Sequence, residues 1–197
     1  MDFLQAKENF EKHGFTVQIF ATGAEAAAYL KEKIQNTTVG FGGSATLREM
    51  GLFEALSEKN AVSWHHRVQS HDVRRQATLA QVYVTSTNAA SQTGELVNID
   101  GAGNRLVGML YGPRQVYVVA GRNKLTPDLP SAIHRAKNVA APQRAAQLGC
   151  QTPCAVKQDK CYDCQSPDRI CRATLILDRC PMLTPTEVIF VDEELGL

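Results

Sequence analysis

The sequence has almost no net charge and no long apolar run. Its 197 residues include 21 Lys and Arg against 20 Asp and Glu, which leaves a formal net charge of +1. Proteins that bind nucleic acid or an anionic membrane surface usually carry a strong positive field, so the near balance argues against both partners. The apolar runs are also far shorter than the ~20 residues that cross a bilayer, which predicts no membrane insertion.

The first residues lack the features of an export signal. The segment MDFLQAKENFEKHG is polar and acidic early, without a basic start followed by an apolar core. We therefore expect a cytoplasmic protein. Hydrophobic residues make up 44% of the chain and charged residues 21%, a globular composition that argues against disorder. A chain of this length suits one α/β domain over residues 1–197.

Residues 81–124 alternate short apolar runs with polar turns. Strands are predicted at 82–84, 96–99, 106–111 and 116–120, because Gly, Pro, Asn or Ser residues bound each run. In α/β proteins the polar groups at strand ends are held by a stiff sheet and often carry the chemistry. The polar residues that follow the ends of these predicted strands are Asn88, Asp100, Asn104, Arg105, Asn123 and Lys124.

A Gly-rich turn follows a short predicted strand at 38–41. Gly42 and Gly43 precede Ser44 and Thr46, and Ser44 is a suitable N-cap for a helix at 47–50. Such a turn can bind an anion, because Gly allows close backbone approach and successive N–H groups point outward. The pattern is neither a P-loop nor a dinucleotide fingerprint. The alternative is a tight turn that only lets the helix pack on the sheet.

The flanking segments are predicted to form scaffold. Thr22 and Glu25 have the spacing of a capping box at the start of a helix. Helices are also predicted at 133–139 and 142–148, with a split near Ala141-Pro142. The β-branched runs at 173–177 and 187–191 are predicted strands at or near the edge of the sheet.

Two strings resemble the signature segments of the LUD (lactate-utilisation) domain family. They are VGFGGSATLREMGL and TSTNAASQTGELVNIDGAGNRLVGMLYGPRQVYVVAGRNK, and the resemblance extends over nearly the whole chain. It implies the fold of ribose phosphate isomerases and CoA transferases, a three-layer α/β/α sandwich. It also implies a role in lactate or related organic-acid oxidation beside an iron–sulfur partner, since one member is the small subunit of a bacterial iron–sulfur complex that oxidises lactate to pyruvate. Many stand-alone members have no assigned reaction.

The Gly-rich turn and Asp100-Gly101-Ala102 are also similar to segments of ribose phosphate isomerases. Those enzymes continue with further acidic residues, whereas Gly103-Asn104-Arg105 follows here. Their later catalytic Glu–Lys pair has no clear counterpart beyond Lys124. An isomerase moves protons with carboxylates, and this chain offers only one at that place, so an isomerase is a weak alternative.

Together these segments predict a pocket for a small metabolite that carries a carboxylate or phosphate. The candidate catalytic residues are Asp100 and Lys124. The candidate substrate-binding residues are Gly42, Gly43, Ser44, Thr46, Asn88, Asn104, Arg105 and Asn123. Structural roles stay open for several of them. Asp100 and Asn104 beside glycines also suit a tight hairpin turn, Arg105 also suits the surface, and Lys124 also suits a place beside an acidic neighbour.

Three histidines, His65, His66 and His71, lie close together in the sequence. They lack the i, i+4 spacing of a helical pair of metal ligands, and no carboxylate motif accompanies them. We therefore interpret them as solvated loop residues.

All six cysteines lie between positions 150 and 180. Cys154, Cys161, Cys164 and Cys171 have the spacing C-x6-C-x2-C-x6-C within a Cys-rich insertion at about residues 150–172. Without an export signal, clustered cysteines indicate a metal or redox site before disulfides, and four thiolates suit a tetrahedral zinc ion or an iron–sulfur cluster. The alternative is a loop of free thiols in which Cys161 and Cys164 form a reversible pair. Cys150 and Cys180 are expected to be packing residues.

The leading hypothesis is therefore a LUD-family protein that binds a small anionic metabolite in organic-acid oxidation. One alternative is a non-catalytic regulatory or electron-transfer subunit that uses a Cys-ligated metal. This alternative gains weight because the Cys segment resembles that of stand-alone members and is absent from the small lactate-complex subunit. A third, by fold analogy alone, is a sugar-phosphate or CoA-ester enzyme. Turnover and oligomeric state stay open, and a homo-oligomer is compatible with the sequence.

Overall fold

A six-stranded parallel sheet forms the centre of the protein. The structure is a computed structural model that describes residues 2–68, 70 and 72–197. The strand order is β1-β10-β7-β4-β2-β3, and every pair in it is parallel. These strands are β1 (Thr16–Phe20), β2 (Thr38–Phe41), β3 (Ala61–Ser63), β4 (Val82–Ser86), β7 (Gln115–Gly121) and β10 (Thr186–Val191).

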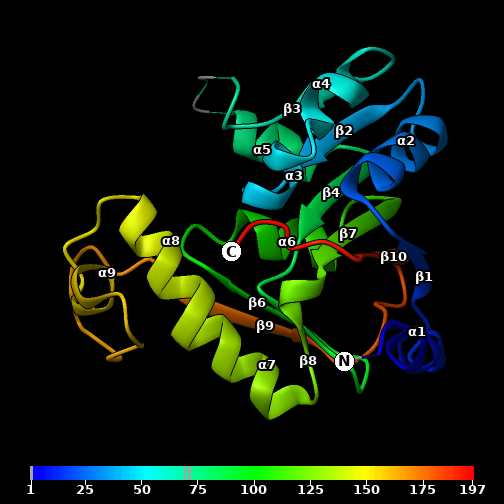
Figure 1. Ribbon diagram of the computed structural model, residues 1–197. Coiled ribbons are helices and arrows are strands. Elements are labelled where there is room, and N and C mark those ends of the chain that lie inside the picture. The colour runs from blue at the N-terminus through cyan, green and yellow to red at the C-terminus, as the bar shows by residue number, and fades with distance from the viewer. Residues whose placement is uncertain (1, 69, 71) are drawn as a thin grey trace.

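Helices cover both faces of this sheet (Figure 1). The side chains of β7 alternate between the two faces, with Val116 and Val118 in one apolar cluster and Tyr117 and Val119 in the other. The first cluster includes side chains of α1 (Phe3–Lys12), α5 (Val73–Thr78) and α6 (Asn104–Leu110). The second includes side chains of α2 (Gly23–Lys33), α3 (Ala45–Glu49) and α4 (Leu52–Ser57). This arrangement is the expected three-layer α/β/α sandwich.

A second, four-stranded sheet in the order β8-β5-β6-β9 lies beside the first. Its strands are β5 (Ala89–Ser91), β6 (Leu96–Asp100), β8 (Leu125–Thr126) and β9 (Ala173–Leu177). It packs against a long helical run made of α7 (Leu129–Arg135), the π-helical turn η2 (Ala136–Ala140) and α8 (Ala141–Gln147), which Figure 1 shows beside β6 and β9. The strands within residues 81–124 therefore belong to two different sheets, some to the central sheet and others to the second.

The predicted strand at 106–111 is wrong, because α6 occupies this part of the chain. Gly103 takes a left-handed conformation (φ 82°) that turns the chain into the helix. Gly108 then lies against the Tyr83 ring, where an added Cβ would come within 2.5 Å of a ring carbon. A short apolar run does not distinguish a buried strand from a buried helix, and here the glycine-dependent contact favours the helix.

Several predictions about the ends of helices are confirmed. The Thr22–Glu25 capping box is present, and the Ser44 hydroxyl accepts a hydrogen bond from the Leu47 amide at 3.2 Å. The predicted helix break at Ala141-Pro142 is wrong. The chain remains helical through Pro142, and the preceding π-helical turn accommodates a proline that has no N–H and would crowd the carbonyl of the previous turn.

The last strands and the Cys segment complete the fold. β9 lies at an edge of the second sheet, as predicted, but β10 lies between β1 and β7 inside the central sheet. The short helix α9 (Pro153–Lys157) precedes an irregular segment at 158–172, which leads into β9. Within the part of the chain that the structure describes, no helix has the length and apolar character needed to cross a membrane.

Candidate functional site

A cavity of about 630 Å³ opens at the carboxyl ends of the parallel strands. The β2–α3 turn, the end of β4 and the η1 turn (Arg122–Lys124) line it from the central sheet, and the end of β6 lines it from the second sheet. The helix α8, residues 169–172 of the Cys segment, the histidines after β3 and Arg74 of α5 also line it. The carboxyl ends of parallel strands meet at one edge, which is where ligands of open α/β sheets usually bind.

The structure brings most of the predicted site residues to this cavity. Those that line it are Gly43, Ser44, Asn88, Asp100, Asn104, Arg105 and Lys124. Gly42, Thr46 and Asn123 do not line it. The Thr46 side chain lies behind Lys124, and Asn123 holds the C-terminal segment by accepting from the Leu195 amide at 3.2 Å and donating to the Gly196 carbonyl at 3.2 Å.

The Gly-rich turn is held tightly from behind. A Cβ on Gly42 would lie 2.6 Å from Thr85 Oγ1, so glycine lets the turn pass close to β4. The buried Trp64 indole donates to the Gly42 carbonyl at 3.1 Å. The helix α3 has only five residues and contributes little dipole, so the case for anion binding here depends on the side chains across the cavity.

Asp100 closes the turn between β6 and α6. Its Oδ1 accepts from the amides of Gly101 at 2.7 Å and Ala102 at 3.3 Å, and its Oδ2 accepts from the Arg105 amide at 3.0 Å. Both carboxylate oxygens are therefore engaged with the backbone. This geometry suits a structural carboxylate better than a proton carrier.

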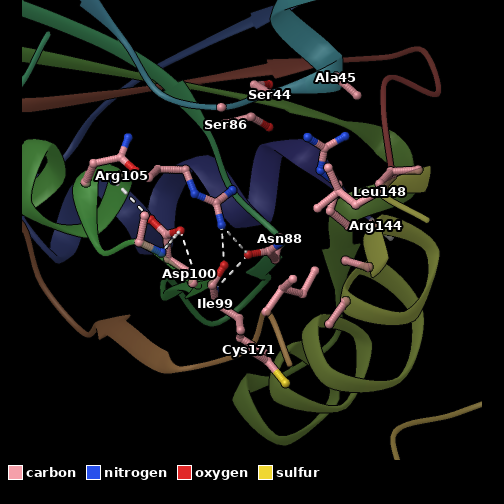
Figure 2. Close-up of a pocket in the computed structure, with 18 of the residues that line it drawn as sticks. Ser44, Ala45, Ser86, Asn88, Ile99, Asp100, Arg105, Arg144, Leu148 and Cys171 are labelled. Carbon is pink, nitrogen blue, oxygen red and sulfur yellow. Dashed lines mark hydrogen bonds between the residues drawn. The ribbon is translucent and has the colours of Figure 1, made fainter. Parts of the chain in front are cut away.

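The Arg105 guanidinium fastens two segments of the cavity wall together. Its Nη2 donates to Asn88 Oδ1 at 2.9 Å and to the Ile99 carbonyl, as the dashed lines in Figure 2 show. Burial lowers the pKa of Arg105, while the nearby Asp100 opposes that effect. Arginine remains protonated in proteins, so this position adds a fixed positive charge to the cavity.

Lys124 is buried, with only 4% of its surface exposed. Its Nζ donates to Thr46 Oγ1 at 2.7 Å and to Ser86 Oγ at 2.8 Å. No carboxylate of the described residues forms an ion pair with it. Burial, and then the positive charges of Arg135 and Arg105, lower the pKa of Lys124 to about 7. This lysine can exchange a proton near neutral pH.

Further arginines, which were not predicted as site residues from the sequence, also line the cavity. One of them, Arg169, forms an ion pair with Asp163 at 2.9 Å. The others form, together with two predicted residues, a set that we call the cavity cations: Arg74, Arg105, Lys124, Arg144 and Arg172. Among the residues that the structure describes, none of them forms an ion pair with a carboxylate. Arg74 comes from α5, Arg144 from α8 and Arg172 from the Cys segment, so only the fold brings them together.

The interpretation of His65 and His66 as solvated residues is wrong. Both are half-buried and line the cavity with their ring centroids 4.4 Å apart, and His66 also lies beside the Trp64 ring. The Nδ1 atoms of both are buried and have no hydrogen-bond partner among the residues that the structure describes. Burial lowers the pKa of His65 to about 4 and also lowers that of His66, so both are neutral at pH 7. His71 lies outside the described residues.

The four predicted metal ligands line one small cavity of about 10 Å³. All the cysteines carry free thiols, and within the described chain no group of three or more His, Cys, Asp or Glu side chains is arranged to hold a metal ion. Metal binding by Cys154, Cys161, Cys164 and Cys171 therefore stays a prediction. Cys150 and Cys180 each pack against an apolar cluster.

Comparisons with known proteins identify the fold and the family. No curated protein matches the chain. A crystal structure of a DUF162 family protein from Deinococcus radiodurans is similar over 96% of this chain and 95% of that one, with a TM-score of 0.57 and 14% identity, which shows a shared fold. A ribose 5 phosphate isomerase A from Neisseria gonorrhoeae matches less well, over 56% of this chain and 57% of that one, with a TM-score of 0.35 and 16% identity. The model of the LUD domain family matches residues 4–191, and the chain therefore belongs to this family, which is associated with lactate utilisation in general.

Proposed function

We propose that the protein binds a small organic anion in the 630 Å³ cavity and acts in the oxidation of lactate or a related organic acid. The observation that carries the proposal is the charge of the cavity wall. Among the described residues that line the cavity there are five cavity cations, besides the paired Arg169, and one acidic side chain, Asp100, whose two oxygens already accept hydrogen bonds from the backbone. A carboxylate or phosphate ligand supplies the missing negative charge.

Coulomb attraction is large enough to make an anion the favoured occupant. Two opposite unit charges about 4 Å apart attract by about 4 kcal/mol at the effective dielectric constant typical near a protein surface. The cavity volume also lies within the range of small-molecule sites. A ligand that contacts even two of the cavity cations therefore gains enough to offset part of the cost of its own desolvation.

Lys124 and Asp100 have different roles in this proposal. Lys124 loses and gains a proton near neutral pH, which is the property of an efficient general acid or base. Asp100 instead positions the Arg105 backbone at the start of α6. Oxidation of a 2-hydroxy acid to a 2-oxo acid releases two electrons and two protons. One of the two hydrogens comes from the hydroxyl and the other from the Cα–H bond. In this proposal Lys124 takes the hydroxyl proton, and a redox group on the partner protein takes the Cα hydrogen together with the two electrons.

A thermal-shift screen against lactate, sugar phosphates and CoA esters tests binding. At a ligand concentration 100 times the Kd, binding stabilises a protein by about 2.7 kcal/mol, which raises the Tm by about 5–10 °C for a chain of this size. Arg144→Gln removes one cavity cation, and we expect it to weaken anion binding about tenfold. Arg114→Gln, at an exposed position outside the cavity, is the matched control.

Two outcomes would count against the proposal. If none of these anions raises the Tm of the wild-type protein, the binding role is refuted. If anions bind but an iron–sulfur protein does not co-purify from the native host, the role in organic-acid oxidation loses its support while anion binding stands.

A further inference from the structure

Residues 158–172 are held in place by very few backbone contacts. They form neither helix nor strand, and most of their side chains from Gln158 to Asp168 are exposed. Among the described residues, the one hydrogen bond between backbone groups within 159–169 joins the Arg169 amide to the Ser166 carbonyl, at 3.0 Å. About two-thirds of the hydrogen bonds in folded proteins join backbone groups, whereas this segment is held mainly by side-chain hydrogen bonds, such as that from the Cys161 amide to Asn138 Oδ1 at 3.0 Å.

Several of the partly buried side chains of this segment are cysteines. Cys154 of α9 is buried, and Cys161, Cys164 and Cys171 are half-buried around the same small cavity. Its volume of about 10 Å³ corresponds to about one water-sized sphere. The space suits a single ion.

The turn between Cys161 and Cys164 brings both cysteines to one side of the segment. Asp163 has a positive φ of 43°, which is unusual for a residue other than glycine and reverses the chain here. The Asp163 amide donates to Cys161 Sγ at 3.3 Å.

Two cations also lie at this cavity. The Arg169 guanidinium donates to the Cys164 carbonyl at 2.7 Å and to the Cys171 carbonyl at 2.9 Å, which connects two of the cysteine positions. Lys137 of η2 also lines the cavity. Four thiolates around a divalent ion leave two negative charges in excess, which Lys137 and Arg169, the latter also paired with Asp163 at 2.9 Å, would partly offset.

We propose that Cys154, Cys161, Cys164 and Cys171 bind one zinc ion. As no three ligands already form a metal site among the described residues, the thiols would move inward as the ion binds. Zinc prefers four tetrahedral thiolates in structural sites, and such ions supply folding free energy to segments with little core of their own. The proposal does not depend on the anion site. Because Arg169, Ile170 and Cys171 line both cavities, zinc would also fix one wall of the anion site.

Metal analysis of the full chain tests the proposal. We expect protein purified under reducing conditions without chelator to contain one zinc per chain by mass spectrometry. Zinc should be lost in Cys161→Ser and in Cys164→Ser and retained in Cys180→Ser, whose thiol lies outside the small cavity. Zinc-stripped wild-type protein titrated with Co²⁺ should develop the intense near-ultraviolet absorption of thiolate-bound cobalt. This readout does not require that any variant folds.

Three results would overturn the proposal. Wild-type protein that contains no zinc and gives no thiolate–cobalt absorption has no such site. Stoichiometric iron with the broad visible absorption of a cluster would replace zinc with a different cofactor. Retention of zinc in Cys161→Ser and Cys164→Ser would place the metal elsewhere in the chain.

Discussion

Replacing Lys124 with methionine is expected to make the protein more stable at low pH. The charged amine is buried between two hydroxyl groups without an ion-pair partner among the described residues. Its pKa falls from 10.5 to about 7. This difference corresponds to a penalty on the order of 5 kcal/mol for burying the protonated form, since each pKa unit is worth about 1.4 kcal/mol. Methionine fills similar space without the charge.

The substitution also removes two hydrogen bonds, which limits the gain. Leaving a buried polar group without its partner costs about 1–3 kcal/mol. The cost here lies at the lower end, because the Ser86 hydroxyl can donate to Thr46 Oγ1 at 3.3 Å and Thr46 Oγ1 can donate to the Leu195 carbonyl at 3.2 Å. We expect Lys124→Met to raise the free energy of unfolding by about 2–4 kcal/mol at low pH.

The sign of the pH dependence follows from linkage. Below the folded pKa of about 7, the folded and the unfolded state both hold the proton, so the folded protein bears the full penalty. Between pH 7 and 10.5 the unfolded state binds more protons, so the wild-type protein gains stability from this residue as the pH rises. The advantage of Lys124→Met should therefore shrink across this window, reach zero at about pH 8.5–10, and become a deficit of about 1–3 kcal/mol by pH 10.5, where only the lost hydrogen bonds remain.

Urea unfolding of both proteins at several pH values measures this difference. Other titrating groups are common to the two proteins and cancel in the comparison. A difference in unfolding free energy that stays constant from about pH 6 to about pH 10 would refute the reasoning, since it would mean that Lys124 keeps an ordinary pKa. Addition of a bound anion should reduce the advantage of Lys124→Met at low pH, because the anion favours the charged lysine.

Three other substitutions test the roles assigned to residues near the cavity. Asp100→Asn should lower the unfolding free energy by about 1–2 kcal/mol in urea, since it weakens the hydrogen bonds that start α6; full stability together with lost turnover would instead show a catalytic carboxylate. Arg105→Lys should cost about 1–3 kcal/mol and weaken anion binding in calorimetry, because lysine cannot bridge Asn88 and Ile99 in the same way; unchanged binding and stability would contradict that bridge. Gly108→Ala should lower the Tm through a clash with the Tyr83 ring, at a cost of about 1–3 kcal/mol; an unchanged Tm would show that the ring moves aside.

The sequence was sufficient to predict most of the sheet and part of the site. The polar residues after β4 and β7 could be predicted to meet because the carboxyl ends of neighbouring parallel strands lie at one edge. This reasoning placed Asn88 and Lys124 on the same cavity. The helix caps formed by Ser44 and Thr22 could also be predicted, because each side chain accepts a hydrogen bond from an amide only three residues further along the chain.

Other features depend on contacts that no short segment contains. The helix at 104–110 requires Gly108 to fit against a ring 25 positions earlier in the chain, so its apolar run alone favoured a strand. Arg144 and Arg172 reach the cavity from α8 and the Cys segment, and neither belongs to a recognisable motif. The partial burial of His65 and His66 depends on packing beside Trp64. The flanking sequence is polar and gave no indication of this packing.

The cavity collects groups that reduce the stability of the folded protein when no ligand is present. Lys124 is a buried cation without an anionic partner, and the Nδ1 atoms of His65 and His66 are buried without a hydrogen bond among the described residues. Each such group costs free energy, and the cavity cations repel one another. Proteins keep costly arrangements of this kind mainly at functional sites, where a ligand supplies the missing partners. An anion that accepts from Lys124 and donates a hydroxyl to an imidazole would meet both requirements at once. A hydroxy acid has both groups, whereas an anion without a hydroxyl group, such as chloride or acetate, has only the charge.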